Sequence, residues 1–266
     1  MLSTKVAATM STGSIIVNAL AQNRIALLEP EAKDICRAYK LPVPEFILAT
    51  TMNQAAKFAE KIGFPVVMKI VSPDILHKTE ARGVLLGLYT KRDVENGFSK
   101  LLLNAKAFKK TADIRGVLIE HMAPAGLEVI VGGMRDPQFG PVVMFGLGGI
   151  FAEVLEDVTF GLAPIKKSEV REMIKGIRGY RAFTGFRGML PVDEGAIASI
   201  VVQVSKIINE NQQIGQIDLN PVMAYSRGCS VVDARVLLAS THKTKRELTK
   251  NDGSNPRKKA NRSANR

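Results

Sequence analysis

Histidine is scarce in this sequence, and one of its 3 histidines follows a short apolar run. The stretch SPDILHKTE, residues 72 to 80, places His77 just after the run PVVMKIV at 65 to 71. A histidine in such a loop is either a solvated surface side chain or a nucleophile presented at the edge of a site. The polar residues elsewhere in the apolar segments bear on this choice.

Several charged residues lie inside segments that are otherwise apolar, where a charge is costly unless it has a partner. Lys69 lies within VVMKIV and is either a lysine that reaches solvent at the strand end or a cation held for phosphate. Glu120 follows GVLI and Glu128 precedes VIVGG, so two carboxylates stand on neighbouring strands. Each of them is alternatively an ordinary acid on an edge strand.

A further polar group lies near the end of the sequence. Asp218 and Asn220 are two residues apart in IDLNP, hence on one face of a strand, and Asp233 comes from the next strand. Oxygen ligands from two adjacent strands suit Mg²⁺. The alternative is a turn formed by Asp and Asn before Pro221.

A glycine-rich stretch, GLGG at 146 to 149, is a weaker candidate. Backbone N–H groups around Gly146, Gly148 and Gly149 would cradle a phosphate if the stretch opens a helix containing Phe151 and Glu153. The alternative is a glycine-rich turn with no ligand.

The elements that must position these residues alternate between helices and strands, as in α/β and α+β enzymes. Apolar spacing of three to four, acidic first turns and terminal glycines predict helices over 29–40, 51–63, 91–108, 166–177 and 193–210. Short apolar runs predict strands within 41–49, 64–71, 82–89, 114–122, 127–134, 141–149, 214–225 and 228–238. The last two strands are expected to pair antiparallel. In the last helix one apolar face is expected, formed by Ile197, Ile200, Val201, Val204, Ile207 and Ile208.

Composition places the chain among globular proteins. With 266 residues, 46% hydrophobic and 23% charged, it is long enough for one large domain or two modest ones. No apolar run approaches the roughly 20 residues of a membrane span, so we expect no membrane contact. Cys36 and Cys229 form neither a metal-ligand spacing nor a disulfide framework, which favours a reducing cytoplasm.

The net charge of +12 is concentrated at the end of the sequence. Residues 240–266 hold 9 Lys or Arg and only 2 acidic residues, with almost no apolar side chain after Leu248. Such a segment cannot bury enough surface to offset its ordering entropy, so we expect a disordered, solvated tail. Contact of this tail with RNA or a membrane surface is the alternative, and no nucleic-acid partner is expected elsewhere.

A strand lysine, a glutamate pair and an Asp/Asn set on two late strands, in this order, resemble the ATP-grasp fold. The stretches KIVSPDILHKTEARGVLLGL, RDPQFGPVVMFGLGGIFAEVLEDVTF and IDLNPVMA go further. They resemble the nucleotide-binding β subunit of the NDP-forming acyl-CoA synthetases, the ADP-forming acetyl-CoA synthetases of archaea and some bacteria. The resemblance runs from about Leu27 to Leu238.

The resemblance implies an α/β (α+β) protein with an ATP-grasp fold of two subdomains and the nucleotide between them. We expect an N-terminal extension over 1–26, the first subdomain over 27–112, the second over 113–238, and the tail over 239–266.

The resemblance also implies roles for matching residues on the nucleotide side. Lys69 matches a lysine that contacts nucleotide phosphates, and Glu128 matches a second acid near the nucleotide. Glu120, followed by Met122 and Ala123, matches the hinge that holds adenine through backbone groups.

Other matches concern the metal and the phosphoryl group. Asn220 and Asp233 match the magnesium ligands of the related succinyl-CoA synthetase β chain, and Asp218 stands where that chain has glutamate. His77 matches a histidine of the ADP-forming subfamily that is phosphorylated in transit. We expect Asp218 to bind one ring nitrogen of His77, so that the other nitrogen faces phosphorus.

The implied reaction converts acyl-CoA, phosphate and ADP to acid, CoA and ATP, with Mg²⁺. The acyl-phosphate chemistry would take place on a separate CoA-binding α subunit, most simply in an α₂β₂ assembly, and His77 would relay the phosphoryl group to ADP. Two alternatives stay open. One is a free-standing ATP-grasp carboxylate ligase, which has no need of His77; the other is a non-catalytic basic binding module that uses the tail.

Overall fold

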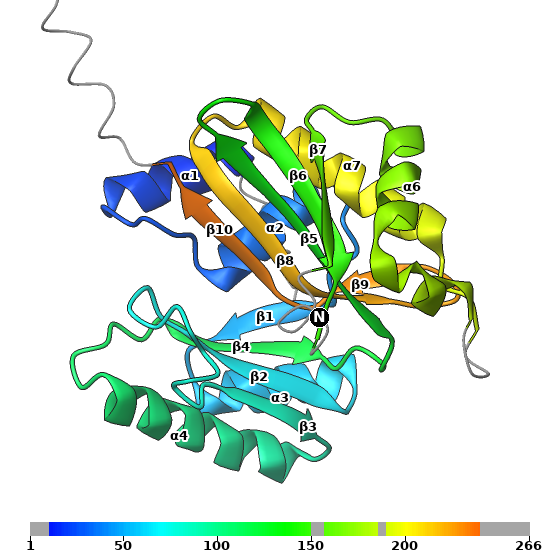
Figure 1. Ribbon diagram of the computed structural model, residues 1–266. Coiled ribbons are helices and arrows are strands. Elements are labelled where there is room, and N and C mark those ends of the chain that lie inside the picture. Colours follow the sequence, from blue (N-terminus) through cyan, green and yellow to red (C-terminus); the bar gives the residue numbers. More distant parts are fainter. Residues whose placement is uncertain (1–10, 150–156, 186–189, 240–266) are drawn as a thin grey trace, which may run out of the picture.

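The computed structural model describes residues 11–149, 157–185 and 190–239. These residues form two β-sheets, one of four strands and one of six, each covered by helices (Figure 1). The basic tail, and Phe151 and Glu153 of the helix expected after GLGG, lie outside the described residues.

The four-stranded sheet has the order β1–β4–β2–β3, and all its neighbouring strands are antiparallel. Its strands are β1 (Phe46–Ala49), β2 (Val66–Val71), β3 (Val84–Leu88) and β4 (Gly116–His121). Helices α3 (Met52–Ile62) and α4 (Lys91–Phe108) pack on it around a core of their own. The hydroxyls of Thr51 and Thr90 accept the first free N–H groups of these helices, which is why the helices begin there.

The six-stranded sheet has the order β10–β8–β5–β6–β7, with β9 paired to β8. Its strands are β5 (Leu127–Asp136), β6 (Gly140–Leu147), β7 (Val158–Leu162), β8 (Ile214–Ala224), β9 (Cys229–Val231) and β10 (Ala234–Leu238). Helices α6 (Lys167–Gly176), η1 (Arg178–Thr184) and α7 (Glu194–Glu210) contribute to its core. The expected apolar face of α7 is confirmed, because all its predicted members are buried.

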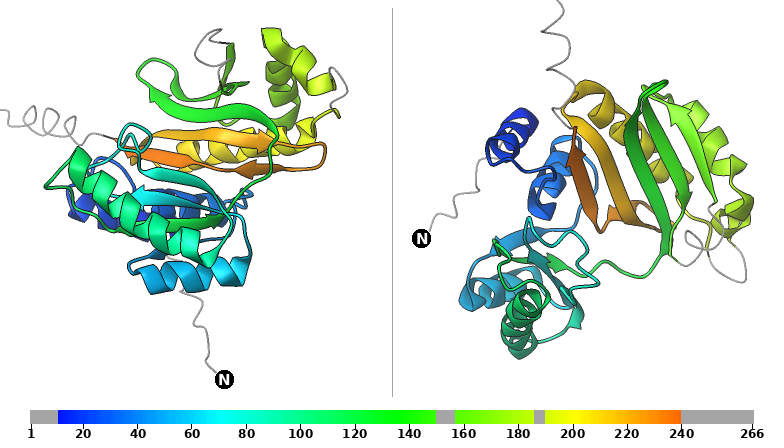
Figure 2. Two further views of the ribbon diagram at one scale, coloured as in Figure 1. Left: turned by 90° about the horizontal axis from the view of Figure 1, so that it is seen from below. Right: turned by 60° about the vertical axis from the view of Figure 1, so that its left-hand side comes forward.

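Two N-terminal helices pack beside β10 (Figure 2). They are α1 (Thr12–Ala21) and α2 (Glu29–Ala38), and both bury apolar side chains in the core of the larger sheet. Between them the chain runs along β10, where the Leu27 N–H donates to Val236 O at 3.0 Å. The described residues before 27 are therefore part of the folded body.

The chain divides between the sheets differently from the expected subdomain boundaries. β4 begins after the boundary expected at residue 112, yet it pairs with β1 and β2 in the smaller sheet. Conversely, α2 falls within 27–112, but its apolar face packs in the core of the larger sheet. The cause is long-range pairing, which local patterns do not reveal. We propose that the boundary lies in the β4–β5 connection.

The predicted helices and strands are otherwise confirmed, including the antiparallel pairing of β8 with β9 and β10. Sequence patterns did not predict α1, β7 or η1. No helix in the described ranges is long and apolar enough to span a membrane.

The packing of α1 yields a stability prediction. Ile16 is 2% exposed and Val17, its neighbour on the same helix, is 62% exposed. We expect Ile16→Ala to lower the free energy of unfolding by about 2–5 kcal/mol, because it leaves a cavity in the larger core. Val17→Ala should change it by less than about 0.5 kcal/mol. Urea unfolding measures both; equal effects would show that α1 is not packed as described.

Candidate active site

His77 lies in an exposed part of a loop, residues 72–83, that joins β2 to β3. Its side chain is 62% exposed, whereas Ile75 and Ala81 on either side are buried in the core of the smaller sheet. Asp74 fixes the beginning of the loop by accepting from the Asp113 N–H at 2.7 Å and from Lys109 Nζ at 2.6 Å. The histidine is thus presented to solvent between fixed points.

The end of the loop folds into a compact turn. The Gly83 N–H donates to Lys78 O at 2.7 Å, and the Arg82 N–H donates to Thr79 O at 3.0 Å. Gly83 is required there, because a Cβ atom would lie 2.5 Å from the Ile70 side chain on β2. The turn therefore packs directly against the strand that carries Lys69.

A buried group of charges lies where the two sheets meet. Glu29 and Lys33 stand one turn apart on α2, Lys69 lies on β2 and Glu120 on β4. Lys69 Nζ is 2.8 Å from Glu29 Oε1 and 2.7 Å from Glu120 Oε1. Lys33 Nζ is 3.1 Å from Glu29 Oε1 and also contacts Glu120 Oε2.

Lys78 and Asp233 complete this group, which we call the charge cluster: Glu29, Lys33, Lys69, Lys78, Glu120 and Asp233. Lys78 Nζ lies 3.0 Å from Glu29 Oε2 and 3.5 Å from Asp233 Oδ2. Lys69 Nζ also donates to Val232 O at 2.8 Å, in the segment before β10. The cluster contains as many ammonium groups as carboxylates, so burying it leaves no net charge.

The opposite charges of the cluster stabilise one another and so offset the cost of burial. Burial alone would raise the pKa of Glu29, but the ammonium groups around it, above all that of Lys69, hold this pKa well below its usual range. Burial would lower the pKa of Lys69, and the carboxylates of Glu29, Glu120 and Asp233 raise it instead. Glu29 and Lys69 are therefore both charged at neutral pH.

The negative charge of Asp233 is less well compensated by its neighbours than that of Glu29. Burial, followed by repulsion from Glu29, raises its pKa by more than the neighbouring ammonium groups lower it. Its Oδ1 atom is buried and has no hydrogen-bond partner among the described residues. Such an oxygen is ready to accept a further cation.

The predicted metal ligands lie together. Ala234 pairs with Leu219, and the Val232 N–H donates to Pro221 O at 3.0 Å, so Asp233 lies opposite Asn220. Together with the unpartnered oxygen of Asp233, this oxygen-only pair fits Mg²⁺, which keeps several waters and takes few protein ligands. The described residues hold no group of three or more His, Cys, Asp or Glu side chains that could bind a metal.

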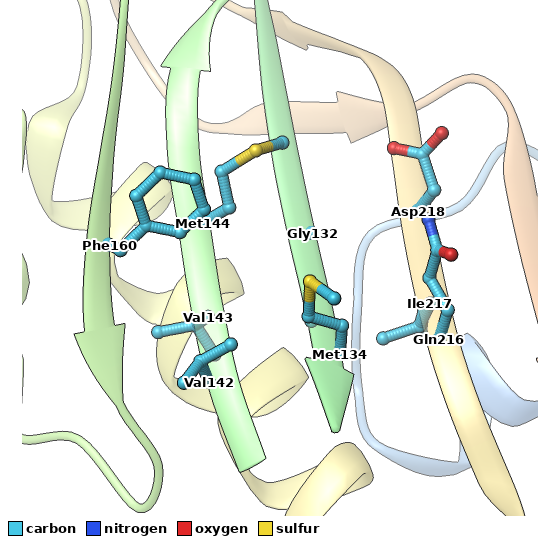
Figure 3. A pocket seen from close by; sticks show the side chains of 10 residues that line it. Gly132, Met134, Val142, Val143, Met144, Phe160, Gln216, Ile217 and Asp218 are labelled. Carbon is cyan, nitrogen blue, oxygen red and sulfur yellow. The ribbon is translucent and has the colours of Figure 1, made fainter. Parts of the chain in front are cut away.

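Asp218 lies on the same strand, on a sheet face that is otherwise largely apolar. Figure 3 shows it on β8 beside Gly132 of β5, with Met144 and Phe160 further across the sheet. Burial and repulsion from Asp233 raise the pKa of Asp218. Neither a hydrogen bond nor an ion pair joins it to His77, whose Nδ1 lies 3.9 Å from Glu80.

Glu128 and two of the predicted glycines meet at an open cavity of about 790 Å³ beneath the β4–β5 connection. The Gly148 N–H donates to Glu128 O at 2.8 Å, and a Cβ atom on Gly149 would lie 3.0 Å from Glu128 Oε2. Gly146 lies within β6, where a Cβ atom would lie 2.7 Å from Asp157 O. Close packing at Gly146 and Gly148, and a positive φ of 63° at Gly149, thus account for the three glycines without a phosphate.

The predicted hinge residues lie at the end of β4 and directly after it. The Glu120 side chain belongs to the charge cluster, while the Met122 N–H donates to Pro65 O at 3.0 Å. Ala123 makes no hydrogen bond in the part of the chain that the structure describes, and it lines a smaller cavity with His121. Backbone groups of Ala123 are therefore free to bind a ligand.

Sequence reasoning missed Glu29, Lys33 and Lys78 as members of the site. One available signal was the spacing of Glu29 and Lys33, four residues apart on the same side of α2 as the apolar Ala32 and Cys36. Lys78 carried no such signal, because only the folded loop brings it to Glu29 and Asp233.

Comparisons with known proteins agree with this geometry. An ATP-grasp domain model matches residues 18–238. The chain is 49% identical to the β subunit of the ADP-forming acetate–CoA ligase I of Pyrococcus furiosus, over 84% of this chain and 96% of that subunit.

Solved structures give the same result. An acetyl-coenzyme A synthetase 1 of Ca. Korarchaeum cryptofilum, with coenzyme A and Ca-AMPCP, is 43% identical, with a TM-score of 0.84 over 86% of this chain and all of that chain. In a second structure of this enzyme, with coenzyme A and Mg-AMPPCP, the phosphohistidine segment points towards the nucleotide-binding site. That structure is 41% identical to this chain, with a TM-score of 0.77, and the match covers 86% of this chain and 100% of that chain. The chain therefore belongs to the ATP-grasp family and, within it, to the β subunits of ADP-forming acetate–CoA ligases.

Proposed function

We propose that this chain passes a phosphoryl group through His77, between a partner α subunit and ADP, in the reaction acyl-CoA + phosphate + ADP = acid + CoA + ATP. The observation that carries the proposal is the position of His77. It is exposed on an anchored loop, and the next residue, Lys78, belongs to the same charge cluster as Lys69. A solvated surface histidine would need no such support.

The proposed step balances at the histidine. A ring nitrogen of His77 attacks the phosphorus carried by the partner, an N–P bond forms, and the bond to the partner's leaving group breaks. An oxygen of the ADP β-phosphate then attacks the same phosphorus, and the N–P bond breaks to give ATP. The chain's contribution is to hold the nitrogen and the nucleotide in line.

The nucleotide would lie between the two sheets. Lys69 would place a positive charge near the phosphates. To bind them, its ammonium group must first release one of its carboxylate partners in the charge cluster. Free backbone groups at Ala123, with Met122, are proposed to bind the adenine, and Glu128 to face the ribose side. No phosphate contact is needed to explain glycines 146, 148 and 149, because packing and backbone conformation explain them.

Asn220 and Asp233 are proposed to hold Mg²⁺, which when bound supplies positive charge against the phosphate oxygens. Asp218, two residues before Asn220, would accept a ring N–H of His77 and so fix the tautomer. Because the two side chains are not joined in this structure, that role requires the His77 loop to move.

A partner is needed for the full reaction. The related Pyrococcus protein is a β subunit, a name that implies a separate α subunit. We propose a CoA-binding α subunit as the partner, in an α₂β₂ assembly. The acyl substrate would be selected by that partner.

The relay is tested by labelling the full chain with Mg²⁺ and γ-labelled ATP. We expect an acid-labile, base-stable label, as an N–P bond gives, on the wild type and none on His77→Ala, because the substitution removes the ring nitrogen that carries the phosphoryl group. His121→Ala is the matched control, since His121 is also exposed and lies on β4, and it should label normally. Label that persists in His77→Ala, or no label on a chain that binds ATP, would contradict the relay.

The metal site is tested by titrating Mg²⁺ in the same assay. Asp233→Asn and Asn220→Ala should each raise the Mg²⁺ concentration for half-maximal labelling by about tenfold or more, the factor expected from losing an interaction of about 1.5–3 kcal/mol with a charged group. Asp113→Asn, at an exposed ion pair with Arg115, should leave it unchanged. An unchanged requirement in both ligand variants would place the metal elsewhere.

A further inference from the structure

Lys78 joins the loop of the proposed nucleophile to the proposed metal site. It directly follows His77, but the two side chains differ sharply in environment: that of His77 is 62% exposed and that of Lys78 is 18% exposed. The ammonium group turns inward and lies between Glu29 Oε2, at 3.0 Å, and Asp233 Oδ2, at 3.5 Å. One end of this side chain is thus fixed to the loop and the other to the cluster.

The two carboxylate oxygens of Asp233 have different surroundings. Its Oδ2 atom is the one near Lys78, while its buried Oδ1 atom has no hydrogen-bond partner among the described residues. Asn220 lies opposite, so a divalent cation bound by this pair would lie close to the Lys78 ammonium group. Two cations that share one buried carboxylate repel each other.

We propose that Lys78 and a divalent cation compete for the Asp233 carboxylate, so that cation binding releases the turn that carries His77. The inference rests on the proposed metal site. It makes Lys78 a positioning residue, which acts on the loop and not on the phosphoryl group.

The surroundings explain why Lys78 has no equivalent partner to turn to. If Asp233 engages the cation, Lys78 retains only Glu29 Oε2, and the other oxygen of that carboxylate, Oε1, is already shared by Lys33 at 3.1 Å and Lys69 at 2.8 Å. A single carboxylate among three ammonium groups holds each of them less strongly. The attachment of Lys78 is therefore the one that the cation weakens.

The remaining contacts of the loop determine which of its residues are released with Lys78. Asp74 stays bound to Lys109 and to the Asp113 N–H, and Ile75 and Ala81 stay in the core. The released part is then the short turn of residues 76–80. Such a movement would reorient His77 without unfolding the loop, because Ile75 and Ala81 stay in the core on either side.

Two measurements on the full chain, with Mn²⁺ as the probe and no nucleotide, test the proposal. The first is Mn²⁺ affinity, from the electron paramagnetic resonance signal of free Mn²⁺. The second is amide hydrogen exchange of residues 76–83, where the N–H groups of Arg82 and Gly83 bond within the turn. Both are independent of phosphoryl transfer, so they separate this proposal from a failed relay.

We expect Mn²⁺ to accelerate exchange in residues 76–83 of the wild type. In Lys78→Met, which keeps the length of the side chain but removes its charge, exchange should be fast without metal and insensitive to it. Mn²⁺ should bind this variant about tenfold more tightly, since its competitor is gone. Lys109→Met is the matched control: it removes the ion pair to Asp74 in the same loop, and Mn²⁺ affinity should stay that of the wild type.

Contrary outcomes are equally clear. Unchanged or weaker Mn²⁺ affinity in Lys78→Met would overturn the competition. Should that variant fail to fold, the wild type alone decides, because Mn²⁺ that slows exchange in residues 76–83, leaves it unchanged or does not bind would equally overturn the proposal. In any of these cases His77 labelling by ATP, if present, would leave the relay itself standing.

Discussion

The buried charge cluster is the interaction on which the rest of this structure depends. It joins segments that the chain keeps far apart: α2 from the body of the larger sheet, β2 and β4 from the smaller sheet, and the residue before β10. Charges buried in this way are tolerated only if they compensate one another, and breaking one pair leaves an uncompensated charge. The equal number of ammonium and carboxylate groups satisfies this condition, and it fixes the two sheets relative to each other.

The same cluster links the parts that the proposed chemistry needs. Lys69 offers a cation to the nucleotide, Asp233 an oxygen to a metal ion, and Lys78 a connection to the loop of His77. Because these groups share carboxylates, a ligand that engages one of them changes the balance of the others. A relay that must alternate between a partner and a nucleotide benefits from such sharing, since the loop need not be held permanently in either arrangement.

Much of this arrangement is predictable from sequence, and what is not predictable depends on contacts between residues far apart in the chain. Periodicity located the helices other than α1 and η1 and most strands, and charged residues in apolar segments drew attention to Lys69, Glu120 and Asp218. Family resemblance supplied the order of the motifs and the proposed role of His77. What no local pattern contains is long-range pairing: the place of β4 beside β1 and β2, the packing of α2 against β10, and the meeting of Lys78 with Glu29 and Asp233. These contacts form only when the chain has folded into its two sheets and the sheets have come together.

The central claim is tested most directly by a double-mutant cycle on Lys33 and Glu120, the buried pair that joins α2 to β4. In urea unfolding, Lys33→Met and Glu120→Gln should each cost about 3–5 kcal/mol, and the double variant should cost less than their sum by at least about 1 kcal/mol. The exposed pair Asp113 and Arg115 is the control, with a coupling below about 1 kcal/mol. Strictly additive losses at Lys33 and Glu120 would contradict a mutually compensated cluster, and with it the basis of this account.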